Sequence, residues 1–84
     1  MISKGIVRLV NLHTGFFAIE TADGDYPVSE MTDTCEVAAG DEVSGNLDSP
    51  MSETLQNITQ GYSMSVYVQG THCAAATARA MVFR

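Results

Sequence analysis

Short runs of β-branched and aromatic residues, separated by turn-forming residues, restrict this chain to an all-β fold. The clearest run is Tyr62–Val68, where apolar side chains at every second position alternate with Ser63, Ser65 and Tyr67. Runs of the same kind occupy residues 6–10, 16–21, 26–29 and 42–47. Because 84 residues is the length of one small domain, we expect a single barrel or sandwich that spans residues 1–84.

Alternation also assigns the two faces of the run at 16–21. Phe17 is expected to point into the core, whereas Phe16 shares a face with Glu20 and should be at least partly exposed. The Asp23-Gly24 pair that follows supplies the positive φ angles of a tight hairpin turn. The run therefore leads by a hairpin into the next strand.

Two segments are ambiguous between strand and helix. Residues 53–59 can form a strand, but Met51, Leu55 and Ile58 also have the spacing of one helix face. The alanine-rich stretch Cys73–Ala80 has high helix propensity, whereas residues 78–83 alternate as in a strand. For this last segment we predict a strand at 78–83.

The charged residues are few and unevenly placed. Four Lys and Arg against ten Asp and Glu give a formal net charge of −6. All ten acidic residues lie from Glu20 to Glu53, a stretch without Lys or Arg. Affinity for phosphates comes largely from lysine and arginine, so this charge disfavours binding to nucleic acid and to anionic membranes.

The chain has no apolar run long enough for a signal peptide or a membrane span. We therefore expect a cytoplasmic protein without a membrane partner. In that compartment Cys35 and Cys73 are expected to be reduced thiols and not a disulfide.

The sequence carries no signature of catalysis. It has no nucleophile motif, no phosphate-cradling glycine loop and no Cys–His pair with an orienting third residue. The soft metal ligands do not form the close pairs of a structural zinc site; they are His13, His72, Cys35 and Cys73. We therefore predict neither an enzyme nor a metal or other cofactor.

Two motifs in the first half of the chain match a known pattern in order and spacing. Gly5–Asn11 (GIVRLVN) leads into Thr14–Ile19 (TGFFAI), which resembles the G-x-V-K-W-F-N and K-G-F-G-F-I motifs of cold-shock domains. Asp25–Ser29 (DYPVS) stands where that family has D-V-F-V-H, and residues 39–43 (AGDEV) resemble the turn before its fourth strand. The resemblance covers residues 4–47 and implies a small five- to six-stranded Greek-key OB-like barrel that binds single-stranded nucleic acid.

Most residues that would hold nucleic acid in that family are replaced. Leu9 stands for the tryptophan of G-x-V-K-W-F-N, Ala18 for the second ring of K-G-F-G-F-I, and Pro27 for the ring of D-V-F-V-H. Each base stacked on a ring contributes about 1–3 kcal/mol, so most of this affinity should be lost. Single-stranded nucleic-acid binding is therefore the less favoured hypothesis, and the residues that remain for it are Lys4, Arg8, His13 and Phe16.

The favoured hypothesis is a non-enzymatic protein-interaction or self-associating module. Tyr67 is expected on an outer face beside Ser63, Ser65 and Gln69, and an exposed tyrosine of this kind is typical of protein interfaces. The strand that carries it is also a candidate for edge-to-edge pairing with a second copy. The partner is expected to be another protein or a second copy of the chain.

Overall fold

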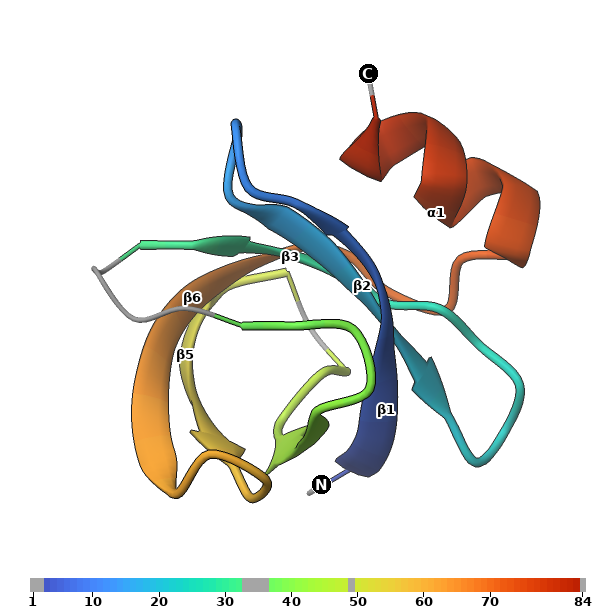
Figure 1. The fold of residues 1–84 in the computed structure, drawn as a ribbon. Helices are drawn as coiled ribbons and strands as arrows, with labels where there is room; N and C mark the ends of the chain where they lie inside the picture. Colours follow the sequence, from blue (N-terminus) through green and yellow to red (C-terminus); the bar gives the residue numbers. More distant parts are fainter. Residues whose placement is uncertain (1–2, 33–36, 49, 84) are drawn as a thin grey trace.

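The structure, a computed structural model, describes residues 3–32, 37–48 and 50–83. It is a closed antiparallel β-barrel with one short helix on its outside (Figure 1). The strands are β1 (Ser3–Asn11), β2 (Phe16–Thr21), β3 (Val28–Met31), β4 (Glu42–Gly45), β5 (Ser52–Asn57) and β6 (Tyr62–Gly70), and the helix is α1 (Ala75–Val82). The prediction of a small OB-like barrel is confirmed, with six strands.

The order of the strands around the barrel is β1-β2-β3-β6-β5-β4. Strands β1, β2 and β3 are consecutive neighbours, and β4 then lies beside β1, which is the 4-1-2-3 order of a Greek key. The chain returns through β5 to β6, which closes the barrel against β3.

Closure of the barrel contradicts one sequence prediction. Strand β6 was expected to offer an edge to a second copy, but its backbone pairs with β3 on one side and β5 on the other. A strand paired on both sides has no free donors and acceptors for a further strand. The expectation that β6 is an edge strand is therefore wrong.

The two ambiguous segments adopt different structures. The first forms strand β5 and inserts Leu55 and Asn57 into the barrel. The second forms helix α1, so the prediction of a strand at 78–83 is wrong. A helix bonds its own backbone groups, whereas the closed barrel offers this last segment no strand to pair with. The helix propensity of the alanines therefore determines that this last segment is a helix.

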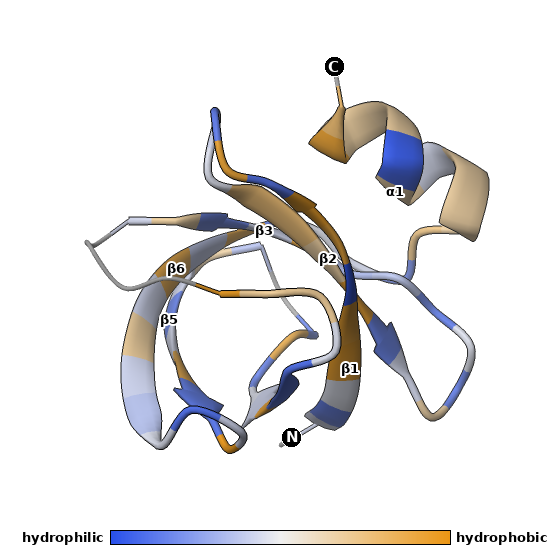
Figure 2. Cartoon of the chain, in the orientation of Figure 1, coloured by the Kyte–Doolittle hydropathy of each residue, from blue (hydrophilic) through white to orange (hydrophobic). Residues whose placement is uncertain are grey.

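The apolar residues form two separate clusters. The first fills the barrel and includes Phe17, Ile19 and Leu55, all fully buried. The second lies between α1 and the outside of the barrel and is built around Ala18, Val28, Ala78 and Val82. Figure 2 shows the hydropathy of each residue along the chain, with strongly apolar residues on β1 and alternating polar and apolar bands along β6. The described part of the barrel therefore has an apolar patch on its outside that α1 covers.

Candidate functional site

Helix α1 covers the outer face of β1, β2 and β3. It contacts all three strands, and Figure 1 shows it on the outside of the barrel beside β1 and β2. The amide of Asn11 donates a 2.9 Å hydrogen bond to the carbonyl oxygen of Val82, and the Tyr26 N–H donates one of 2.8 Å to the Cys73 carbonyl. These bonds fix both ends of the helical segment to the barrel.

This cover changes the environment that the sequence predicted for β2. Phe16 and Ala18 do lie on the outer face, but Ala18 is fully buried and Phe16 is half-buried against the α1 cluster. The expected partial exposure of Phe16 is therefore confirmed, whereas α1 covers the outer face of β2 at Ala18. Farther along β2, Glu20 is only half-buried and pairs with Arg8.

The four residues proposed for nucleic-acid binding do not form one site. The Arg8 Nε donates a 2.8 Å bond to Glu20 Oε1, so its charge is matched. That bond, together with one from the Tyr26 hydroxyl, lowers the pKa of Glu20. Exposed His13 lies in the turn beyond β1, whereas Lys4 lies near the opposite end of that strand, about 23 Å from Asn11 at the usual rise per strand residue.

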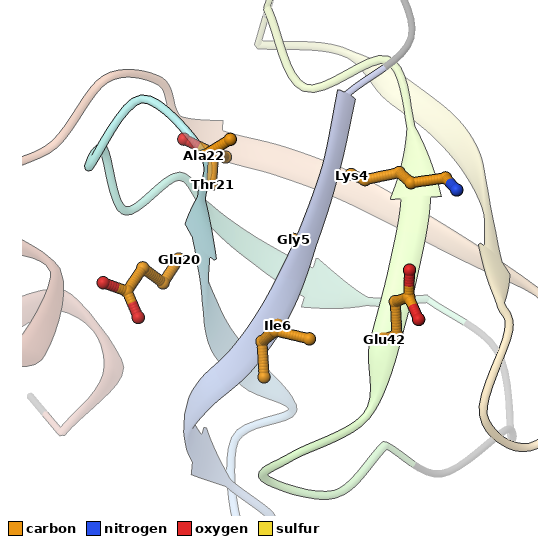
Figure 3. A pocket seen from close by; sticks show the side chains of 7 residues that line it. All are labelled: Lys4, Gly5, Ile6, Glu20, Thr21, Ala22 and Glu42. Carbon is orange, nitrogen blue, oxygen red and sulfur yellow. The ribbon is translucent and has the colours of Figure 1, made fainter.

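Lys4 borders an open hollow of about 340 Å³ on the outside of β4, β1 and β2. Figure 3 shows Lys4 and Glu42 on one side of β1, Glu20 on the other, and Ile6 between them. The hollow is lined by Lys4, Gly5, Ile6, Glu20, Thr21, Ala22 and Glu42. These residues include no aromatic ring on which a base could stack.

A second exposed surface lies on the outside of β5 and β6, and we call it the β5–β6 face. Its exposed side chains are Ser52, Thr54, Gln56, Ser63, Ser65, Tyr67 and Gln69. Within this set Ser52 pairs across the strands with Tyr67, Thr54 with Ser65, and Gln56 with Ser63. The predicted outward position of Tyr67 is confirmed, since 40% of the residue is exposed.

Met51 is an exposed residue directly before β5. It is 46% exposed, and its carbonyl oxygen accepts a 2.9 Å bond from the Val68 N–H. Glu30 of β3 is the cross-strand neighbour of Tyr67 and accepts a 3.1 Å bond from Gln69 Nε2. Tyr67 thus has Glu30 as its cross-strand neighbour on β3 and Ser52 as its cross-strand neighbour on β5.

A buried polar cluster at one end of the barrel was not found from the sequence. Asp41 Oδ2 accepts hydrogen bonds from Asn57 Nδ2 at 2.9 Å and from the Ala38 N–H at 3.0 Å. Burial raises the pKa of Asp41, but hydrogen bonds from Asn57, Ala38 and Gln60 outweigh burial and hold the pKa below the ordinary 3.8. The cluster ties a turn to two strand ends and is structural.

The connection between β6 and α1 holds an ion pair. His72 Nδ1 lies 2.8 Å from Asp25 Oδ2, and His72 has a φ of 53°. The hydrogen bond to Asp25 and the charge of that carboxylate raise the pKa of His72 above its ordinary 6.5. Because the folded pKa is above the unfolded one, the stabilisation is complete below about pH 6.5 and is lost as the pH rises through the folded pKa.

Replacing His72 by glutamine is therefore expected to reduce the pH dependence of stability. The free energy of unfolding, measured with urea at about pH 5.5 and 8.5, should fall less with pH in His72→Gln than in the original chain. The control His13→Gln, in an exposed turn, should keep the original pH dependence. Equal pH dependence in all three chains would contradict a contribution from the Asp25 pair.

The remaining sequence predictions concern metals, thiols and membranes. Within residues 3–32, 37–48 and 50–83, no three His, Cys, Asp or Glu side chains come together as metal ligands. Cys73 is a free, half-buried thiol whose pKa is raised by burial, and Cys35 lies outside the described residues. In the part of the chain described here, no helix has the length and apolar character needed to cross a membrane.

These features define a small six-stranded antiparallel barrel of OB-like type, with one outer face covered by its own helix and another exposed. Comparisons with protein-family models, with curated proteins and with solved structures gave no match.

Proposed function

We propose that this chain is a non-enzymatic protein-interaction module that contacts its partner through the β5–β6 face. The observation that carries this proposal is Tyr67, which is 40% exposed on a face whose other exposed β5 and β6 side chains are uncharged and polar. Tyrosine is enriched in protein interfaces, whereas lysine, aspartate, glutamate and serine are depleted there. The exposed tyrosine and the uncharged side chains of the β5–β6 face follow this pattern, and its three serines do not.

The β5–β6 face is also preorganised for binding. Tyr67 is held between Glu30 of β3 and Ser52 of β5, and both neighbouring strands belong to the closed barrel. A tyrosine on a rigid backbone loses little conformational entropy when it is covered, so more of the contact energy appears as affinity.

Charge indicates the character of the partner. Glu30 and Glu53 border the β5–β6 face, and the chain as a whole carries a formal charge of −6. A basic or neutral protein surface would approach this face faster and with less repulsion than an acidic one. We therefore infer a basic or neutral protein partner, met in the cytoplasm.

The alternative function, weak binding of single-stranded nucleic acid as in cold-shock domains, has less support. Its one stacking ring, Phe16, is half-buried in the α1 cluster, and Arg8 is paired with Glu20. Relationship to the cold-shock family is itself a proposal. The Greek-key order and the positions of β1 and β2 agree with it.

Replacing Tyr67 by serine tests the proposed interface. The immobilised full chain would first capture its partner from a cytosolic extract, and the purified partner would then be titrated calorimetrically. We expect Tyr67→Ser to weaken binding at least tenfold. Truncation of a tyrosine at the centre of an interface often costs about 2 kcal/mol or more of binding free energy, whereas truncation of most interface residues costs less.

Leu12→Ser is the matched control for this titration. Leu12 is 79% exposed in the turn between β1 and β2, away from the β5–β6 face, and its replacement should leave the affinity unchanged. Unchanged affinity in Tyr67→Ser, or a loss found only in Leu12→Ser, would contradict the assignment of the interface.

A further inference from the structure

Helix α1 is a separable unit of the fold. The barrel closes through β4 and β1 without it, and the helix packs only on the second, outer cluster. It has eight residues, no side-chain hydrogen bond at its N-cap Ala74 and no acidic residue in its first turn. A helix of this length is marginal alone in water, so α1 depends on the outer face of β1, β2 and β3.

The connection that brings α1 back to this face is short and strained. Residues 71–74 alone separate Gly70, the end of β6, from Ala75, the start of α1. Among the described residues, His72 is the one non-glycine residue with a positive φ, at 53°. This left-handed conformation is unfavourable for a residue with a Cβ. The strain arises where the chain turns so that α1 reaches its own barrel.

We propose that α1 is exchanged between two copies of this chain, so that the helix of each copy packs on the outer face of β1, β2 and β3 of the other. An exchanged helix makes the same contacts as in the closed chain, and a short, strained hinge favours exchange because an extended hinge releases the strain. The exchanged contacts use the outer face of β1, β2 and β3 and not the β5–β6 face, so this inference does not depend on the proposed protein interface.

Contacts at the hinge oppose the exchange. The His72–Asp25 pair and the bond from the Tyr26 N–H to the Cys73 carbonyl both hold the connection against the β2–β3 turn of the same chain. The bond from Asn11 to Val82 lies at the far end of α1 and is kept in either arrangement. His72 therefore acts in two ways, since its φ favours exchange and its ion pair favours the closed chain.

Hinge length provides the first test. The full chain, a variant with Gly-Ser-Gly inserted after His72, and a variant without Thr71 and His72 would be refolded at about 10 µM to 1 mM and sized by light scattering. We expect a mixture of one-chain and two-chain species for the original, one-chain species for the insertion and two-chain species for the deletion. One-chain species for all three at every concentration would overturn the proposal.

Two substitutions separate the effects of His72. Asp25→Asn keeps the left-handed residue but removes the charge of the pair, and it should lower the dissociation constant of the dimer relative to the original chain. His72→Gly removes the strain and the ion pair together, so its reference is Asp25→Asn. Relative to that reference, His72→Gly should raise the dissociation constant about ten- to a hundredfold, since both hinges are relieved in the closed chains. If the original chain and both variants had equal dissociation constants, or if either constant shifted in the direction opposite to the one expected, the role of the hinge would be overturned.

Mixing two damaged chains tests the exchange itself. Ala78→Asp places a carboxylate on the helix side of the outer cluster, and Ala18→Lys places an amine on its barrel side. In each variant alone, the contact between α1 and the barrel carries one unpaired buried charge. In an exchanged mixed dimer, one helix–barrel contact combines the aspartate with the lysine, and the other contact has the original residues on both sides. We expect two-chain species and protected α1 amides only in the mixture; a mixture of unprotected one-chain species would overturn the proposal.

Discussion

Replacing Ala78 by aspartate is expected to detach α1 while the barrel stays closed. Ala78 is fully buried in the outer cluster, and moving a carboxylate from water into apolar contacts costs several kcal/mol. An eight-residue helix has little stability of its own to offset this. Amide hydrogen exchange of residues 75–82 should therefore accelerate at least about a hundredfold, whereas the amides of the β-strands should keep their protection.

Ala76→Asp is the matched control for this experiment. Ala76 is exposed on the same helix and lies in its first turn, where an acidic side chain is favourable to the helix dipole. Its α1 amides should keep the original protection. If the α1 amides were as protected in Ala78→Asp as in Ala76→Asp, the outer cluster would not be what holds the helix.

Replacing Asp41 by alanine is expected to lower the free energy of unfolding by about 2–4 kcal/mol. The substitution leaves the Asn57 amide, which is 1% exposed, and the Ala38 N–H without their shared acceptor. For a domain of this length the loss is a large part of the total stability, which is typically about 0.05–0.15 kcal/mol per residue. Urea unfolding at neutral pH measures it.

The depressed pKa of Asp41 adds a pH signature to this prediction. A group whose folded pKa lies below its unfolded value of 3.8 stabilises the fold above that value, and the effect is lost as the pH falls through the folded pKa. Asp41→Ala should therefore lose stability less steeply below about pH 4 than the original chain. The control Asp23→Ala, in an exposed turn, should change stability by less than about 0.5 kcal/mol; a similar small change in Asp41→Ala would contradict the structural role.

The strands were predictable because their signals are local. Alternation along Tyr62–Val68 correctly placed Met64 inside the barrel and Tyr67 outside, since a period of two is a property of the strand itself. The same reasoning correctly put Phe17 inside. Once the strands and their turns were assigned, the all-β class and the small barrel followed.

The features that failed depend on contacts between distant parts of the chain. Ala18 is buried by a helix some sixty residues later, and no local pattern around Ala18 signals that contact. Residues 78–83 satisfy a strand pattern and a helix pattern alike, and the closed barrel decides between them. The Asp41–Asn57 bond likewise joins residues that are 16 positions apart.

The candidate site was predicted in part. Tyr67 was identified as an exposed residue, whereas exposed Met51 entered the sequence analysis only through its spacing with Leu55 and Ile58 on a possible helix face, because that segment was ambiguous in sequence. Arg8 and Phe16 were grouped as the residues retained from a family motif, and Lys4 and His13 were added as nearby basic residues. Their separation follows from the length of β1, from the Arg8–Glu20 pair and from α1, and only the first of these is visible in the sequence.

The central claim is that the covered outer face of β1, β2 and β3 does not bind single-stranded nucleic acid. It is tested by titrating the full chain with labelled oligo-dT and with a mixed-sequence RNA, at low and moderate salt. With Phe16 half-buried, Arg8 paired and a formal charge of −6, we expect no saturable binding up to about 100 µM protein. Micromolar binding that weakens with salt and disappears in Phe16→Ala would contradict the account.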